Sequence, residues 1–414
     1  MVRFLIYLAI ALLVAVPGVL FRITGAHPGA LVEAGVFGMA LLAAGFLLSW
    51  GAEAAESRVS QGLLLAGLAL VTVLPEFAVD IYYAFRAGQV PGSSYVHYAA
   101  ANMTGANRLL IGTAWPLVVI LHWWKSGERA VVLARSNFIE LFFLALASLY
   151  AFVILLKDQI DIVDFIVLLA IFAAYLWRLA LNRKPHAVDD GEDNDDDHDE
   201  DDKEPGPAAV LETLSPRAQW AWTAGLTIVA GTVILIGAEP FAESMIASGR
   251  ILGIDEFLLI QWIAPLTGEA PEIVLGVLFV LAARASSGLI ALISDKINQW
   301  TLLVGALPMA MSIGAGSLAA LPLSARQHEE FFLTAAQSLF AISLLLGLRL
   351  TVGAAALLFV LFALQVGLAF ALQHDPPREI AALTSLAWVY IALALAKLAM
   401  HAAAMVRSRT PRAA

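Results

Sequence analysis

The sequence contains no cysteine, and few of its residues carry a charge. Of its 414 residues, 14% are charged and 60% are hydrophobic, which is more apolar surface than one water-soluble core buries. The lack of cysteine excludes disulfides, thiolate catalysis and cysteine-based metal sites. This composition predicts a polytopic membrane protein, and it argues against a secreted disulfide scaffold, a nucleic-acid binder or a cysteine enzyme.

Motifs for ATP hydrolysis and for metal-dependent catalysis are also missing from the sequence. It has neither G-x-x-x-x-G-K-[ST] nor H-E-x-x-H, and no set of residues suggests a nucleophile with its base. We therefore expect no enzymatic activity and no cofactor, and we expect any transport to be driven by ion gradients.

The negative charge is concentrated in one segment. Residues 189–204 contain twelve acidic side chains and one lysine, a local charge of −11, whereas the whole chain has a net charge of −10. Such a run is typical of a solvated, self-repelling linker. The alternative is a Ca²⁺-sensing or cation-gathering loop, although the run lacks the glycine and the spacing of an EF-hand.

Hydrophobic runs long enough to cross a bilayer recur along the chain. A helical span needs about 20 mostly apolar residues. About twelve segments meet this requirement: residues 4–22, 31–50, 60–86, 95–121, 138–156, 160–181, 218–238, 255–284, 289–313, 329–347, 350–372 and 381–404. Several are longer than a perpendicular helix needs, which predicts tilt or a break.

The basic residues indicate the orientation. With the N-terminus inside, sixteen Lys and Arg residues fall in cytoplasmic loops and six fall outside. We therefore expect both termini and the acidic segment in the cytoplasm, in a protein of the cell (inner) membrane. Residues 4–22 are either the first helix or a signal segment.

Four landmarks occur twice in the same order, on either side of the acidic segment. Gly-Ala-Glu at residues 51–53 recurs at 237–239, and Pro-Glu at residues 75–76 recurs at 271–272. The apolar stretch after each Pro-Glu ends at an arginine, Arg86 or Arg284. A later segment, residues 101–112, matches residues 294–305. The copies are offset by five spans, an odd number, so they cross the membrane in opposite directions. Inverted repeats are typical of secondary transporters, which bind their substrate where the repeats meet.

The predicted fold is therefore an all-α polytopic membrane protein with two inverted five-helix repeats and one extra helix at each end. The predicted divisions are an N-terminal helix (1–30), the first repeat (31–181), the acidic linker (182–216), the second repeat (217–372) and a C-terminal helix with a basic tail (373–414).

The two Pro-Glu motifs are the candidate cation site. Glu76 and Glu272 lie deep in predicted spans, where a carboxylate costs roughly 2.5–3.5 kcal/mol and marks an ion or proton pathway. The preceding proline removes a helical N–H and frees backbone carbonyls. Carboxylate and carbonyl oxygens are ligands for Ca²⁺ and Na⁺. The alternative is that each glutamate is neutral and hydrogen-bonded, or is paired with Arg108 or Lys296.

Other polar residues are expected around this pair. Thr72 and Asp80 share a helical face with Glu76, and Glu269 lies one turn before Glu272. The facing spans carry amide and carboxylate side chains, which are expected to complete the site or to couple it to transport: Asn102, Asn107, Asp295 and Asn298.

These motifs resemble the Ca²⁺/cation antiporter superfamily, which includes the sodium/calcium exchangers. Its repeats carry Thr-Ser-x-Pro-Glu, followed by Gly-Asn-x-x-Gly-Ser-Asn-x-x-Asn/Asp on the next helix. Residues 72–76 (Thr-Val-Leu-Pro-Glu) and 101–110 (Ala-Asn-Met-Thr-Gly-Ala-Asn-Arg-Leu-Leu) match the first copy. Residues 268–272 and 294–303 are a more divergent second copy. The resemblance covers roughly residues 31–372.

The resemblance implies an exchanger-like fold in which Glu76 and Glu272 are the central cation ligands and Thr72 is a ligand of a flanking Na⁺ site. Several ligands of the family pattern are replaced: Val73 and Glu269 stand at the motif serine, Ala106 and Gln299 at the later serine, and Leu110 and Leu303 at the final Asn/Asp. An exchanger with several Na⁺ sites around one Ca²⁺ site requires these oxygen ligands, and the replacements remove them.

Two cations lie close to the predicted site. Lys296 is expected to pair with Asp295 or to extend toward a membrane interface. Arg108 has no partner nearby in the sequence, and it either neutralises Asp80 or Glu76 in one conformational state or serves as a static counter-charge.

The favoured function is a secondary-active antiporter that exchanges Ca²⁺ or another cation for Na⁺ or H⁺ by alternating access. Its expected partners are membrane lipid and inorganic cations. Two alternatives remain: an Na⁺(K⁺)/H⁺ exchanger on the same fold, and a non-transporting regulatory protein that has lost its cation ligands. The missing ligands favour the second alternative, and clustered carboxylates that carry protons favour the first.

Overall fold

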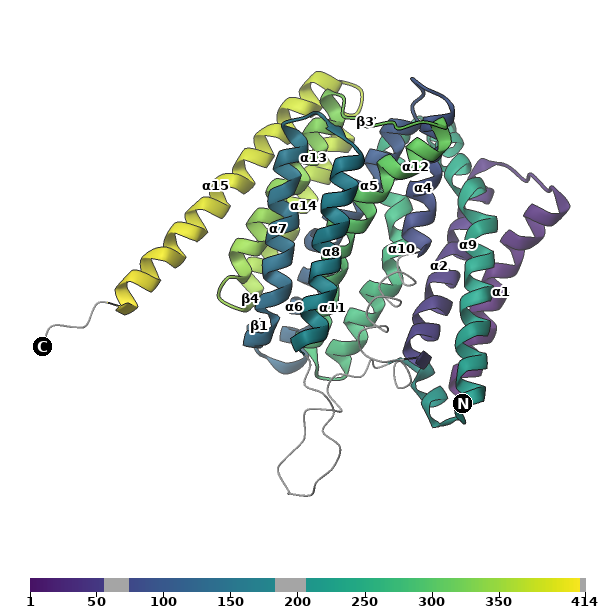
Figure 1. Ribbon diagram of the computed structural model, residues 1–414, viewed down its shortest axis with the longest axis horizontal. Coiled ribbons are helices and arrows are strands. Elements are labelled where there is room, and N and C mark those ends of the chain that lie inside the picture. Colours follow the sequence, from purple (N-terminus) through teal and green to yellow (C-terminus); the bar gives the residue numbers. More distant parts are fainter. Residues whose placement is uncertain (56–73, 183–205, 410–414) are drawn as a thin grey trace, which may run out of the picture.

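A computed structural model describes residues 1–55, 74–182 and 206–409, and this part of the chain is almost entirely helical (Figure 1). Nine of its helices are long and apolar enough to cross a membrane. These helices correspond to nine of the twelve predicted spans. Of the other three, residues 60–86 lie partly outside the described residues, and residues 289–313 and 329–347 contain more polar side chains than the nine. The expected all-α membrane fold is confirmed.

The helices follow the predicted order in both halves. The first half contains α2 (Ala30–Ala55), α4 (Leu74–Gln89), α5 (Tyr95–Leu109), α6 (Trp115–Ser126), α7 (Phe138–Leu155) and α8 (Ile162–Asn182). The second half contains α9 (Pro216–Leu252), α10 (Glu256–Leu281), α11 (Ala285–Asn298), α12 (Val304–Ala315), α13 (Ala325–Leu345) and α14 (Val352–Leu372). Short 3-10 helices, η2 (Arg135–Asn137) and η3 (Pro207–Thr213), precede α7 and α9.

Two small strand pairs connect the halves. Strand β1 (Ala130–Val132) pairs antiparallel with β4 (Arg349–Thr351), and β2 (Gln159–Ile160) pairs antiparallel with β3 (Leu321–Pro322). In the order of elements β1 corresponds to β3, and the two lie at opposite ends of the helices (Figure 1). Corresponding elements at opposite ends show that the repeats are inverted.

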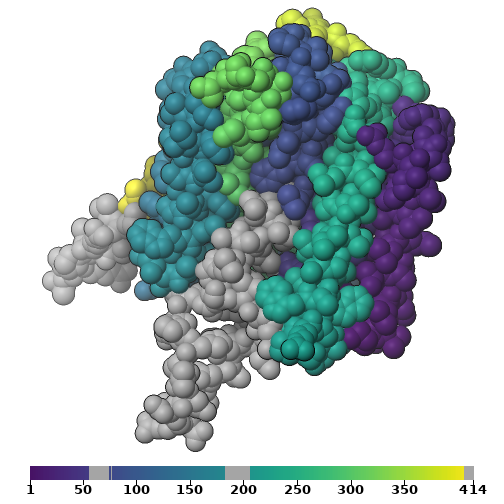
Figure 2. Space-filling model, turned by 45° about the vertical axis from the view of Figure 1, so that its right-hand side comes forward, coloured from purple at the N-terminus to yellow at the C-terminus, as the bar shows by residue number. Residues whose placement is uncertain are grey.

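Helix contacts also recur between the halves. Helix α2 packs along α9, its counterpart in the second half. Helix α12 packs against α4 and α8, just as α6 packs against α10 and α14. Figure 2 shows α12 (green) between α8 (blue) and α4 (indigo). Each half therefore completes the core of the other.

The helix interruptions do not lie where the prolines predict them. Helix α10 continues through Pro265 and Pro271, so the expected break at the second Pro-Glu motif is absent there. Contacts of α10 with α2, α5, α9 and α11 hold the helix together across the missing N–H groups. The interruptions are instead two π-helices, η1 (Leu110–Ala114) and η4 (Gln299–Leu303), between α5 and α6 and between α11 and α12.

Two further helices lie outside the repeats. Helix α1 (Val2–Thr24) packs against α2 and α9, and α15 (Pro376–Arg409) packs along α13 and α14. Both are apolar enough to cross a membrane.

Candidate cation site

Both Pro-Glu motifs approach the same glycine of α2. A Cβ atom added to Gly45 would lie 2.7 Å from Cγ of Pro271 and 3.7 Å from Cγ of Pro75. Only a residue without a side chain allows α2 to approach both prolines this closely. The structure therefore brings together the two motifs that the sequence singles out, one from α4 and one from α10.

The counterpart of Gly45 in the second repeat has a different environment. Ala-Gly, five residues and Gly-Ala-Glu form a pattern that begins at residue 44 and again at residue 230, so Gly231 corresponds to Gly45. A Cβ added to Gly231 meets no atom of the described residues within 4 Å. Within the described part of the chain, the two repeats thus differ at equivalent positions.

The predicted ligands of the first motif are described only in part. Thr72 and the side chain of Glu76 lie outside the described residues, although the backbone of Glu76 belongs to α4. Glu272 is partly buried on α10. Within the described residues, no three His, Asp or Glu side chains converge to hold a metal ion. The role of the glutamate pair as ligands stays a prediction.

Two departures from the family pattern contact each other. Nε2 of Gln299 donates a hydrogen bond to Oε1 of Glu269, which joins η4 to α10. Both side chains are buried. These residues stand at the two serine positions of the second motif, so the two replacements compensate for each other.

Lys296 contacts the first motif rather than a membrane interface. Its side chain is fully buried, and Nζ donates to the carbonyl oxygen and to Oδ1 of Asn107, both at 2.6 Å. The ammonium also lies 5.2 Å from the ring centroid of Trp300. The expectation that Lys296 extends toward an interface is therefore wrong, because backbone and amide oxygens of α5 bind its charge inside the protein.

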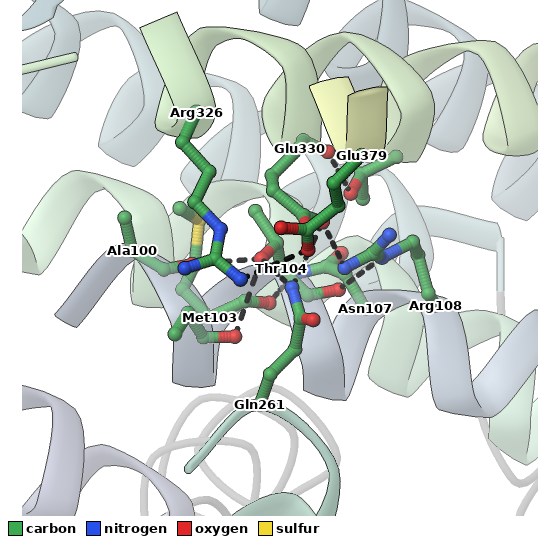
Figure 3. Close-up of polar contacts among 11 residues, drawn as sticks. Ala100, Met103, Thr104, Asn107, Arg108, Gln261, Arg326, Glu330 and Glu379 are labelled. Carbon is green, nitrogen blue, oxygen red and sulfur yellow. Dashed lines mark hydrogen bonds and ion pairs between the residues drawn. The ribbon is translucent and has the colours of Figure 1, made fainter. Parts of the chain in front are cut away.

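Arg108 forms an ion pair with Glu330 of α13, and both side chains are 1% exposed. Its Nε donates to the carbonyl of Thr104 at 3.3 Å, and the guanidinium lies 4.9 Å from the ring centroid of Trp262. Gln261 also donates to Glu330, at 2.8 Å (Figure 3). In this structure Arg108 is the counter-charge of Glu330, a residue far along the chain. Its pairing with Asp80 or Glu76 in one conformational state stays a prediction, because the side chain of Glu76 lies outside the described residues.

The remaining predicted residues lie inside the helix bundle. Asp80, Asn102 and Asn298 are buried on α4, α5 and α11, and Asp295 is half-buried on α11. These helices pack around α10, which carries Glu269 and Glu272. The fold is thus compatible with a shared polar site, and the roles of the individual residues stay predictions.

Sequence reasoning missed a second group of buried charges. Glu329 and Glu330 of α13 and Glu379 of α15 are buried, and Arg326 contacts Glu379 at 2.9 Å. The available signal was the Arg-Gln-His-Glu-Glu run at residues 326–330, which includes the first residues of a predicted span. In the sequence, acidic side chains at this position are typical of a solvated helix end. In the structure α15 covers them.

The family described as "Sodium/calcium exchanger protein" matches residues 29–181 and 222–371. No match was found among the curated proteins. Among solved structures, the chain is similar to a crystal structure of the H⁺/Ca²⁺ exchanger CAX, with 39% identity, a TM-score of 0.85, and coverage of 98% of this chain and 96% of that one.

Two more distant structures share the fold. A structure of native YfkE has 15% identity and a TM-score of 0.60, with coverage of 89% of this chain and 99% of that one. The sodium-calcium exchanger NCX_Mj, soaked with 10 mM Na⁺ and no Ca²⁺, has 18% identity and a TM-score of 0.52, with coverage of 82% and 99%.

Proposed function

Because the chain belongs to the sodium/calcium exchanger family and is a cation antiporter of the membrane, we propose that it exchanges Ca²⁺ for H⁺. Glu76 and Glu272 bind Ca²⁺ in one half of the cycle and protons in the other. The observation that carries this proposal is the approach of both Pro-Glu motifs to Gly45. The similarity to an H⁺/Ca²⁺ exchanger over nearly the whole chain supports the choice of ions.

The contacts of Lys296 and Gln299 favour H⁺ over Na⁺ as the counter-ion. A Na⁺ site needs oxygen ligands that are free to bind the ion. Here the Lys296 ammonium contacts Oδ1 of Asn107 at 2.6 Å, and an amide of Gln299 contacts Glu269. Oxygens that accept hydrogen bonds from protein donors in this way do not serve as ligands of a mobile Na⁺ ion. A carboxylate such as that of Glu272 can bind a proton.

We also infer the membrane arrangement and the energy source. The excess of basic residues in one set of loops supports cytoplasmic termini and a cytoplasmic acidic segment, in the cell (inner) membrane. Ion gradients drive the exchange without a cofactor or a catalytic step. The expected partners are membrane lipid and inorganic cations, with no nucleic acid.

Ion flux in proteoliposomes tests the proposal. The purified chain is reconstituted, and Ca²⁺ uptake is measured with an outward H⁺ gradient, an outward Na⁺ gradient or neither. We expect uptake with the H⁺ gradient only, and we expect Glu76→Gln and Glu272→Gln each to abolish it. Glu239→Gln is the matched control, because Glu239 forms an exposed ion pair with Arg22 at 2.6 Å.

Uptake that follows the Na⁺ gradient would replace H⁺ with Na⁺ as the counter-ion. Transport of Na⁺ or K⁺ against H⁺ without Ca²⁺ would support the first alternative function. Absence of any flux from a folded protein would support a regulatory role, and intact uptake in both glutamate variants would overturn the assigned site.

A further inference from the structure

A series of charged side chains leads inward from the end of the bundle where α10, α13 and α15 begin (Figure 3). Arg326 contacts Asp255 at 2.6 Å and Glu379 at 2.9 Å. The side chains of Arg326 and Asp255 are 18% and 22% exposed, whereas that of Glu379 is 1% exposed. The ion pair of Arg108 and Glu330 lies deeper. The series thus extends from partly exposed side chains at the end of the bundle to the buried Arg108 of α5.

Glu329 is the residue before Glu330 on α13, and its carboxylate has no hydrogen-bond partner among the described residues. The residue is 2% exposed, and neither carboxylate oxygen accepts a hydrogen bond from any donor in the described part of the chain. The two guanidinium groups that face it, Arg108 and Arg326, already contact other carboxylates. The other charges that face it are acidic, Glu330 and Glu379.

Helix α7, which also packs against α13, adds no positive charge in the interior that would compensate an ionised Glu329. On the side of α7, Asp158 contacts His328 at the surface, where both side chains are largely exposed. An ionised carboxylate that is buried without a donor carries a penalty of several kcal/mol in free energy, and a bound proton removes the charge. The geometry therefore favours the carboxylic acid form of Glu329.

Further polar atoms lie deeper in the bundle than Glu329, on α13 and α15. Nε2 of Gln337 donates to the carbonyl of Arg108 at 3.5 Å, but its Oε1 is buried and has no donor in the described residues. The hydroxyl of Tyr390 on α15 is buried in the same way. Buried polar atoms without protein partners are typical of positions that bind internal water, and water conducts protons.

We propose that Glu329 is a proton-binding site separate from the Pro-Glu pair, loaded from the end of the molecule where α13 and α15 begin. Uptake converts one carboxylate into a carboxylic acid, and release returns the proton to water beside Asp255. A role of this site in binding the transported counter-ion rests on the H⁺ exchange proposed above. Helix α15, which lies outside the repeats, would then serve to enclose this site.

Infrared difference spectroscopy of the purified full chain tests the assignment without requiring transport. The carbonyl absorption of protonated carboxyl groups is recorded at neutral pH for the wild type, Glu329→Gln and Glu329→Asp. We expect the Gln variant to lose the intensity of one protonated carboxyl group and the Asp variant to keep it at a shifted frequency. Glu53→Gln is the matched control, because buried Glu53 accepts hydrogen bonds from the backbone of Ala208 and Ala209 and should contribute no such band.

An unchanged carboxylic acid band in Glu329→Gln would overturn the proposal. If that variant does not fold, a band in Glu329→Asp identical to that of the wild type would overturn it as well. The result is independent of the flux experiment. Loss of the band in a protein that does not exchange Ca²⁺ for H⁺ would refute the proposed function alone, and an unchanged band with intact exchange would refute the Glu329 site alone.

Discussion

The divergent motif residues are connected by their own contacts. Gln299 donates to Glu269, and both residues replace serines of the family pattern, whereas Lys296 donates to Asn107, which matches that pattern. At the scale of single residues, the departures from the family pattern therefore form defined contacts within the protein.

The ion pair of Arg108 and Glu330 makes a prediction for stability. Replacing Arg108 with Met leaves a buried carboxylate without its counter-charge, and we expect the free energy of unfolding to fall by roughly 3–5 kcal/mol. The double variant Arg108→Met with Glu330→Met removes both charges and should regain most of this loss. Thermal unfolding in detergent measures both variants. Equal losses in the single and double variants would show that the pair acts through packing alone.

The sequence could predict that Arg108 and Lys296 need partners, but not which ones. Both lie in apolar spans, where a charge demands compensation. Their partners belong to other helices, and contacts between helices that are distant in sequence depend on packing that no local pattern encodes. The candidate ligands were recognisable because the Pro-Glu motif occurs twice.

Glycines set the distances between the helices that carry the site. A Cβ added to Gly105 of α5 would lie 1.8 Å from the carbonyl oxygen of Gln261 on α10. At one end of the bundle, Glu243 of α9 accepts hydrogen bonds from Tyr82 and Tyr95 at 2.7 and 2.6 Å. Close crossings and these polar contacts fix α9 and α10 against α4 and α5.

The glycine pair on α2 and α9 gives a prediction with an internal control. Gly45→Ala places a Cβ 2.7 Å from Pro271, and we expect a loss of about 1–3 kcal/mol in the free energy of unfolding and slower exchange. The Cβ of Gly231→Ala meets no atom of the described residues within 4 Å, so its effect on stability should stay within about 0.5 kcal/mol. Thermal unfolding and Ca²⁺ flux compare the two. Equal effects of both substitutions would contradict the asymmetry between the repeats.

The elements differ in how well the sequence predicts them. Spans follow from long apolar runs, and most predicted ends lie close to those of the helices, whereas α9 continues to Leu252, well beyond the predicted end at residue 238. The continuity of α10 through two prolines does not follow, because neighbouring helices override a local rule. The strands are two or three residues long, too short for any alternation of apolar and polar residues to reveal them.

Inverted symmetry organises the whole molecule. The odd number of spans between the repeats predicts the inversion, and the strand pairs at opposite ends show it in the structure (Figure 1). Because α2 and α9 pack along each other at the junction, movement of one half changes the environment of both Pro-Glu motifs. In the part of the chain that the structure describes, Gly45 lies close to both prolines whereas a Cβ at Gly231 meets no atom within 4 Å, so the repeats differ at this pair of positions.

Equilibrium Ca²⁺ binding to the purified protein, with proton release recorded in the same weakly buffered solution, tests the central claim most directly. The claim is that Glu76 and Glu272 together bind either Ca²⁺ or protons. We predict that Ca²⁺ binding releases protons from the wild type, and that Glu76→Gln and Glu272→Gln each weaken binding by more than about tenfold and reduce the release. Unchanged affinity in both variants, or Ca²⁺ binding without proton release, would contradict the claim.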